Sequence, residues 1–313
     1  MKKLWAIYIT AFMTVLIAGF SMASDCDRKC LEDMADRYLK AMVAHDASRA
    51  PFAKNVIFTE NTIKLPLTEG LWFTSSGLGS FKIYICDLKT DQVAWVGAVK
   101  EHDKPVILSL RLKIVNHLIT EAESIVIRDV DEKNLVNFEK TAPAFSEFLD
   151  PSERISRKEM LKIPELYFDA LKILNDKDVP FDDDCYRLEN GMLTAGTFPG
   201  APKPPPGMPA SPACRNGEIS PMLKTIYNVK PRRTPVIDEE KGITWGIYCF
   251  NHRGLASVEM PDGTVQPTYF NTPNSMPVSE IFRSRNGTIR GIWGLGTAMP
   301  YGIGDGWTGP VYQ

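Results

Sequence analysis

Three polar residues early in the chain have the types and surroundings needed for proton transfer. Glu60 follows the apolar residues Ile57 and Phe58 in a strand-like run. A carboxylate among apolar side chains is desolvated, so its pKa rises and it can act as a general acid or base near neutral pH. His45 stands beside Asp46, and a neighbouring carboxylate can orient a histidine for proton exchange. We therefore predict Glu60, His45 and Asp46 as catalytic residues.

A cation and several aromatic residues would complete such a site. Arg111 lies in an alternating, strand-like segment. Facing inward it would stabilise a phenolic or anionic oxygen, and facing outward it would only be solvated. Large aromatic side chains can wall a pocket by stacking on a ligand, although plain core packing is the alternative. The predicted substrate-binding residues are Tyr38, Phe58, Trp72 and Tyr84.

The catalytic candidates also have structural interpretations. Glu60-Asn61 could be a turn in which the asparagine takes left-handed backbone geometry. His45 lies near the end of a helical pattern, where a histidine interacts favourably with the helix dipole, and Asp46 would then begin the turn. Both interpretations stay open from the sequence.

No cofactor and no metal are predicted. Dinucleotide, P-loop, nucleophile-elbow and zinc-protease motifs are absent from the sequence. The acidic run 182–184 lacks the alternating ligands and closing glutamate of a calcium loop, so we interpret it as a solvated turn. Cys26 and Cys30 do not have zinc-finger spacing, and we assign them to structural use. Asp87, His117 and the segment 252–254 are interpreted as turn residues.

An internal repeat predicts the elements that must position these residues. Residues 37–61 align without a gap with residues 166–190, at an offset of 129. The matches include Tyr38 with Tyr167, Pro51-Phe52 with Pro180-Phe181, and Glu60-Asn61 with Glu189-Asn190. Val115-Asn116 matches Arg285-Asn286 at an offset of 170, and the 41 extra residues are assigned to one proline-rich insertion. A fixed-period self-match is typical of a duplicated unit.

Each copy is predicted to pack helices on one antiparallel sheet. Helical spacing over 28–45 and over 158–176 is followed in each case by several strand-like runs. The fold class is therefore predicted as α+β, in two units. The predicted boundaries are 1–23 for a signal peptide, 24–130 for unit one, 131–156 for a linker, 157–293 for unit two with a proline-rich insertion at 199–240, and 294–313 for a glycine-rich tail.

The first unit resembles the nuclear transport factor 2-like superfamily, which includes the SnoaL-like proteins. The resemblance rests on Ala44-His45-Asp46, Pro51-Phe52-Ala53, Phe58-Thr59-Glu60-Asn61, Glu69-Gly70-Leu71-Trp72 and the closing strands near Arg111. It implies a sheet curved into a cone that holds a small apolar ligand, often with inward Asp–His or Asp–Arg pairs. It also implies an internal pseudo-dimer of the two units, or a homo-oligomer. The second copy resembles the family less well, because it lacks the Gly-Leu-Trp segment. It also has Leu174-Asn175 in place of His45-Asp46, so only unit one is expected to be active.

The net charge, the N-terminal segment and the cysteines indicate where the protein is located and which partners it binds. The net charge is −2 and the sequence pI is near 6.1, which does not favour nucleic-acid binding. Lys2-Lys3, the apolar run 4–20 and Ser21-Met22-Ala23 are typical of a cleaved signal peptide, with an uncleaved anchor helix as the alternative. We predict a periplasmic or secreted protein without membrane contact after cleavage. Six cysteines then suggest disulfides, and Cys185 and Cys214 are paired because they bracket the proline-rich insertion.

The sequence favours an exported, cofactor-free lyase, dehydratase or isomerase. It would use acid–base chemistry on a small apolar or aromatic molecule, with Glu60 and His45-Asp46 exchanging protons and Arg111 stabilising an oxyanion. The alternative is a non-catalytic module that binds a small ligand or a protein partner. An inward cluster of titratable residues would favour the enzyme, and a pocket without them would favour the binding module.

Overall fold

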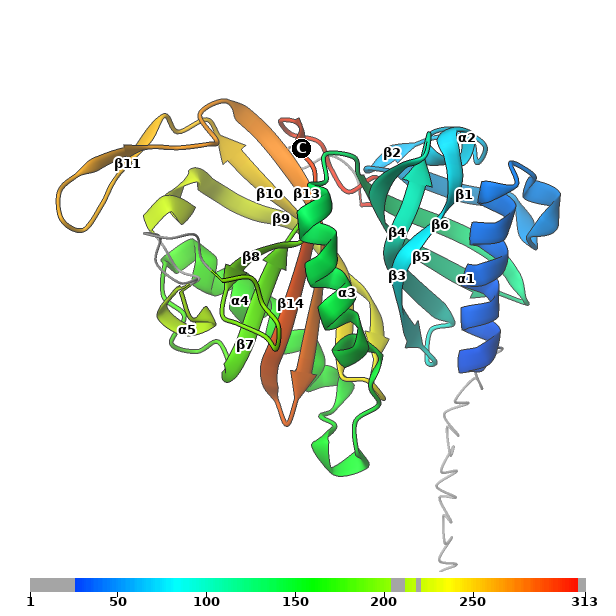
Figure 1. Cartoon of the computed structure of the whole chain (residues 1–313), viewed down its shortest axis with the longest axis horizontal. Coiled ribbons are helices and arrows are strands. Elements are labelled where there is room, and N and C mark those ends of the chain that lie inside the picture. Colours follow the sequence, from blue (N-terminus) through cyan, green and yellow to red (C-terminus); the bar gives the residue numbers. More distant parts are fainter. Residues whose placement is uncertain (1–25, 204–211, 218–220, 309–313) are drawn as a thin grey trace, which may run out of the picture.

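The computed structural model describes residues 26–203, 212–217 and 221–308 (Figure 1). The predicted signal peptide, part of the proline-rich insertion and the end of the predicted tail lie outside these ranges. The described residues form an α+β fold built around two large mixed sheets. Within these ranges no helix combines the length and apolarity that a membrane span requires.

The first sheet follows a long amphipathic helix. Asp27 accepts a hydrogen bond from the Cys30 N–H and so caps the helix, whose buried stripe includes Leu31, Met34 and Tyr38. The sheet has the order β2-β1-β6-β5-β4-β3, and β1 and β6 run parallel. The elements are α1 (Arg28–Val43), η1 (Ala47–Arg49), β1 (Phe52–Glu60), β2 (Ile63–Lys64), α2 (Leu71–Thr74), β3 (Ser75–Asp87), β4 (Gln92–Glu101), β5 (Lys104–Val115) and β6 (Leu118–Ile127).

The second sheet has the order β8-β7-β14-β13-β10-β9, with β7 and β14 parallel. The expectation of purely antiparallel sheets is therefore wrong for one strand pair in each sheet. The elements are α3 (Glu132–Ser146), η2 (Pro151–Glu153), α4 (Arg157–Ile173), β7 (Phe181–Glu189), β8 (Met192–Ala195), α5 (Cys214–Gly217), η3 (Pro221–Thr225), β9 (Ile226–Asp238), β10 (Ile243–Arg253), β11 (Ser257–Glu259), β12 (Val265–Pro267), β13 (Pro273–Arg285), β14 (Thr288–Gly296) and β15 (Met299–Pro300).

The two sheets correspond strand by strand and in register. Pairing of Phe52 with Ile119 in the first sheet matches pairing of Phe181 with Ile289 in the second. At an offset of 129 residues, α1 corresponds to α4 and β1 to β7. At an offset of 151, β3 corresponds to β9 and β4 to β10. At an offset of 170, β5 corresponds to β13 and β6 to β14. We call the parts built on the two sheets unit one and unit two.

Unit two contains two insertions, so the prediction of one insertion is wrong. The first adds 22 residues before β9, where the offset rises from 129 to 151, and the second adds 19 residues between β10 and β13, where it rises to 170. The first contains α5 and is fastened by the predicted disulfide between Cys185 and Cys214, which is confirmed. The second forms the β11–β12 hairpin, the orange arm of Figure 1. Cys26 and Cys30 form another disulfide, while Cys86 and Cys249 are buried thiols.

The units pack on each other through a shared apolar core. It contains side chains of both sheets and of α3, among them Phe81, Val96, Phe138, Trp245 and Trp293. α3 lies at the centre of Figure 1, beside the strands of unit two. The predicted linker is therefore largely a helix that contributes to the core.

Contacts between the units are reciprocal. Ser109 and Ser279, equivalent residues at the offset of 170, hydrogen-bond each other at 2.6 Å between their hydroxyl oxygens. The Cys86 N–H donates to Asp238 at 2.9 Å, and the Ile237 N–H donates to Asp87 at 3.0 Å. Exchange of equivalent partners across an interface is the pattern that two-fold symmetry produces.

Candidate functional site

The carboxylate of Glu60 links the backbone at the start of α2 to the side chain of Arg128. Its Oε2 accepts a hydrogen bond from the Leu71 N–H at 2.7 Å, at the start of α2, and its Oε1 pairs with Arg128 Nη2 at 2.8 Å. The carboxylate packs so closely on Gly70 that a Cβ there would lie 2.4 Å from Glu60 Oε2. Both oxygens thus have structural partners in the described part of the chain.

His45 and Asp46 end α1 and begin η1. His45 has a left-handed backbone, and its Nδ1 lies 2.7 Å from the Trp72 carbonyl oxygen, to which it donates. Asp46 is exposed and accepts hydrogen bonds from the Ser48 hydroxyl and N–H, which hold the pKa of Asp46 below its ordinary value. Neither contact joins these residues to Glu60, so the geometry matches the helix-end interpretation.

Arg111 lies on the opposite face of the first sheet from Glu60. Its neighbours Leu110 and Leu112 pack into the core beneath α1, and strand alternation turns Arg111 the other way. There it is 2% exposed and pairs with Glu121 at 2.8 Å and Glu123 at 2.7 Å. The predicted cluster of Glu60, His45 and Arg111 does not form, because it would need side chains from both faces of one sheet.

The predicted aromatic pocket of unit one is filled by its own side chains. Trp72 is 2% exposed, and its indole N–H donates to the Tyr38 hydroxyl at 2.7 Å. Phe58 is buried in the same core. Tyr84 of β3 is half-buried against this core, and its hydroxyl donates to Asp36 at 2.5 Å. These contacts correspond to the core alternative.

A cavity of about 260 Å³ lies instead in unit two, on the side covered by α4. At the offset of 151, Leu223 of η3 stands where unit one has Trp72 of α2. Both Leu223 and Tyr167, the equivalent of Tyr38, line the cavity. Leucine is smaller than tryptophan, and the side chain of Leu223 borders the cavity beside Tyr167, whereas Trp72 contacts Tyr38 directly. This cavity thus lies in unit two, whereas the sequence places the expected active site in unit one.

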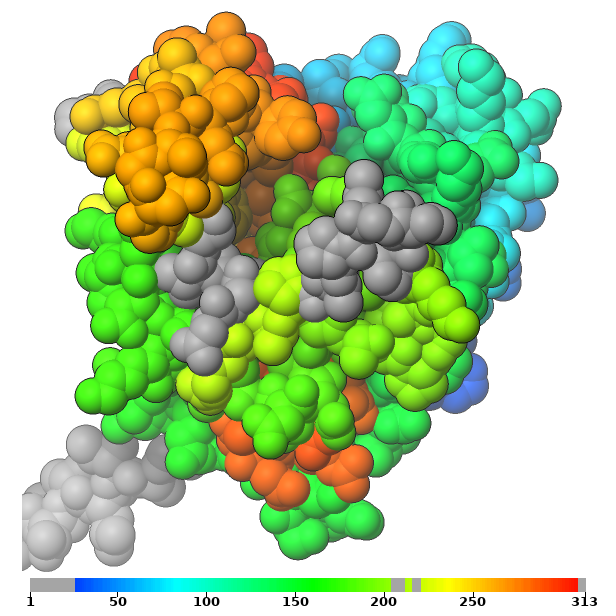
Figure 2. Space-filling view, turned by 60° about the vertical axis from the view of Figure 1, so that its left-hand side comes forward, coloured from blue at the N-terminus to red at the C-terminus, as the bar shows by residue number. Residues whose placement is uncertain are grey.

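The second insertion of unit two contributes one wall, because the segment after β12 supplies Tyr269 and Phe270. η3, the counterpart of α2 in unit one, supplies Met222 and Leu223. Figure 2 shows the hairpin segment in orange and the first insertion in yellow-green on one face of the molecule. The other apolar walls come from β10 and β13 and include Phe250 and Val278.

One part of the cavity wall is polar. Arg187 pairs with Glu189 at 2.8 Å and with Glu280 at 3.3 Å, and it donates to the Thr194 hydroxyl at 3.1 Å. The charge of Arg187 lowers the pKa of Glu189. Arg187, Glu189 and Thr194 line the cavity, while Glu280 is fully buried behind them.

This polar group was missed although the repeat contained its signal. At the offset of 129, Arg187 corresponds to Phe58, and at 170, Glu280 corresponds to Leu110. Both unit-one residues are buried in the apolar core. A charged residue in one copy at the position of a core residue in the other indicates that the interior of the second copy has become more polar there.

His252 adds a neutral imidazole to the same wall. The expectation that His252 is a turn residue is wrong, because His252 lies in β10 and is 2% exposed. Its ring stacks on Phe270 with centroids 3.8 Å apart, and its Nδ1 lies 3.2 Å from Asn274 Oδ1. Because Asn274 donates its amide to Thr272, its Oδ1 accepts the proton of Nδ1, which leaves Nε2 with a lone pair. Burial lowers the pKa of His252 to about 4.

His252 should make the protein less stable in mild acid. Its folded-state pKa of about 4 lies below its ordinary value of 6.5, so the unfolded chain binds the proton more readily. Stability is then fully present above pH 6.5 and is lost as the pH falls towards 4, by about 2 kcal/mol between pH 7 and 5. Urea unfolding at both pH values should show this loss. His252→Gln should remove most of it, whereas the exposed His102→Gln should not; equal losses in all three proteins would contradict the assignment.

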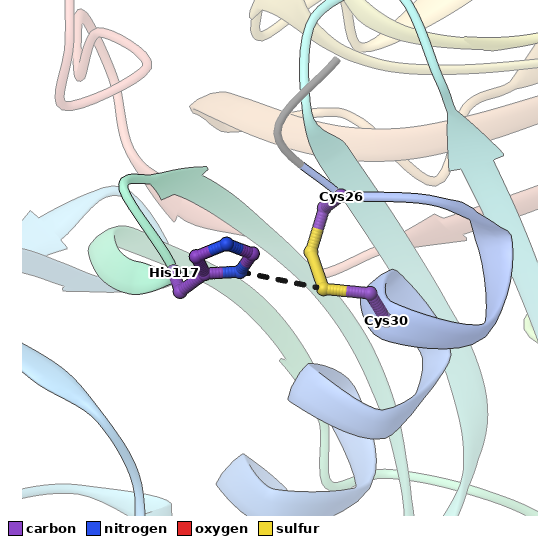
Figure 3. Close-up of side chains that lie close together, drawn as sticks. All are labelled: Cys26, Cys30 and His117. Atoms are coloured by element: carbon purple, nitrogen blue, oxygen red, sulfur yellow. Dashed lines mark hydrogen bonds between the residues drawn. A yellow bond between two sulfur atoms is a disulfide. The ribbon is translucent and has the colours of Figure 1, made fainter.

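Cys26, Cys30 and His117 form a further cluster (Figure 3). The His117 Nδ1 lies 3.9 Å from the Cys30 sulfur. Both sulfurs are joined in a disulfide, and a disulfide sulfur is not the thiolate that binds metals. The arrangement matches the structural use assigned to these cysteines.

One family model matches the chain, at residues 153–294, and it is described as a domain of unknown function (DUF8021). The matched range runs from just before α4 into β14 and contains the residues that line the cavity of unit two, except Gly296. No curated protein and no solved structure matches the chain.

Proposed function

We propose that the protein binds a small, largely apolar molecule in the cavity of unit two. The observation that carries this proposal is the contrast between the units: Trp72 fills the interior of one, while Leu223 leaves an apolar-walled cavity with grouped polar residues in the other. An apolar pocket with a few convergent polar groups is the usual form of a small-molecule site.

The titratable residues favour binding over catalysis. A general acid or base works best with a pKa near the working pH. The pKa of His252 is lowered to about 4, and that of Glu189 is also lowered, so both lie away from neutrality. Acid–base catalysis by a lyase or isomerase is the second candidate, because both residues line the same cavity.

The architecture supports a duplicated, SnoaL-like plan as part of this proposal. Each unit has one long helix on a mixed sheet of the same strand order. We propose that each sheet is a cone and that the two cones form an internal pseudo-dimer, which the reciprocal contacts of Asp87 and Asp238 support. The two disulfides support export to an oxidising compartment.

Calorimetry and product analysis test the proposal together. The purified protein should be titrated with a panel of naphthalene- and cyclohexane-based alcohols, amines and acids, and each mixture should then be separated by chromatography. We expect at least one compound to bind and to be recovered unchanged, and at 100 times its Kd to stabilise the fold by about 2.7 kcal/mol. Turnover that is lost in His252→Gln would favour the enzyme. No heat of binding and no stabilisation with any compound would contradict the proposal.

A further inference from the structure

We propose that this cavity selects ligands that carry a protonated amine on an apolar body and discriminates against carboxylates. The inference rests on the proposed function and names the chemical class that the same cavity would take. It follows from how the charges at the cavity wall are paired.

The guanidinium of Arg187 already forms hydrogen bonds and ion pairs with other side chains of the protein. Its Nη1 donates to Glu189 at 2.8 Å and to Thr194 at 3.1 Å, and its Nη2 contacts Glu280 at 3.3 Å. Two carboxyl groups therefore share one cation. A carboxylate ligand would have to displace one of them and would then lie beside the other, which costs desolvation and like-charge repulsion.

Glu189 is the anion that a ligand can reach. It lines the cavity and its side chain is 40% exposed, whereas Glu280 is fully buried. His252 adds no positive charge at pH 7, because burial lowers its pKa to about 4. Among the described residues, the charged side chains that line the cavity are thus those of Arg187 and Glu189, and Arg187 also contacts the buried carboxylate of Glu280.

The remaining walls suit an organic cation. Phe250 and Phe270 line the cavity, and the faces of aromatic rings attract ammonium groups. Leu171 and Val278 can pack on an apolar body. In unit one, Phe58 stands in place of Arg187, so this polar group belongs to unit two alone.

Three ligands of one shape test the inference by titration calorimetry at pH 7: 1-naphthylmethylamine, 1-naphthylmethanol and 1-naphthoate. We expect the Kd of the amine to be at least tenfold lower than that of the carboxylate, with the alcohol between them. Glu189→Gln keeps the shape and removes the charge, so it should shrink the amine-to-carboxylate ratio at least fivefold. Asp183→Asn removes an exposed charge of the same unit and should leave the ratio unchanged.

The outcomes separate this inference from the proposed function. Equal or tighter binding of 1-naphthoate in the wild-type protein would overturn the inference while leaving a small-molecule site in place. An unchanged ratio in a Glu189→Gln protein that melts cooperatively would overturn the assignment to Glu189. Failure of all three ligands, and of the wider panel above, would instead remove the proposed function itself.

Discussion

Replacing Leu223 with tryptophan is expected to weaken ligand binding at least a hundredfold while unit two stays folded. The substitution copies unit one, where Trp72 occupies the equivalent position and donates to Tyr38 at 2.7 Å. In unit two the new indole would enter a cavity of about 260 Å³ lined by Tyr167, the equivalent of Tyr38. Filling an existing cavity removes the space for a ligand without the strain of overpacking a dense core.

Calorimetry with 1-naphthylmethylamine measures this effect, and thermal melting reports the fold. Trp72→Leu is the matched control, because it makes the reverse exchange in unit one. It should destabilise the protein by about 2–4 kcal/mol through the cavity it leaves, with an unchanged Kd. A folded Leu223→Trp protein that binds as tightly as the wild type would place the ligand elsewhere.

Removing either of two equivalent aspartates at the unit interface is expected to cost about 3–5 kcal/mol. Asp238 is fully buried and pairs with Arg28 at 2.8 Å, while Asp87 is fully buried and pairs with Arg157 at 2.6 Å. Each also accepts a backbone N–H from the other unit. Truncation to alanine removes a carboxylate from a partly buried guanidinium and leaves a backbone amide of the other unit without its acceptor, so Asp87→Ala and Asp238→Ala should have similar effects.

Urea unfolding of both variants tests this expectation. Asp33→Ala removes an exposed carboxylate that pairs with Lys29 on the surface of α1, and it should change the midpoint little. A small effect of either interface variant, comparable with that of Asp33→Ala, would contradict the view that reciprocal contacts hold the units together.

Much of the fold could be predicted because duplication leaves periodic signals. The match at residues 37–61 and 166–190 corresponds to α1 with β1 and α4 with β7, which the structure relates at the same offset. Helical spacing and strand alternation predicted most of the remaining elements. The parallel pairing of β1 with β6 could not be predicted, since no local pattern specifies which strand lies beside which.

The site was harder to predict, because proximity to apolar residues does not show which side chains fill the interior. Glu60 follows Phe58 by two residues, yet its carboxylate accepts a hydrogen bond from the Leu71 N–H and pairs with Arg128. Arg111 lies between Leu110 and Leu112, whose side chains point towards α1. Strand alternation therefore turns the Arg111 side chain to the opposite face of the sheet. The informative comparison was between the copies: Trp72 against Leu223 and Phe58 against Arg187.

A crystal structure of the protein soaked with 1-naphthylmethylamine is the most direct measurement of where the molecule binds its ligand. We expect density for the rings between Leu223, Phe250 and Phe270, with the amine nitrogen within hydrogen-bond distance of Glu189. Density beside Trp72 in unit one, or an unchanged cavity in unit two at a ligand concentration that saturates binding in solution, would contradict it.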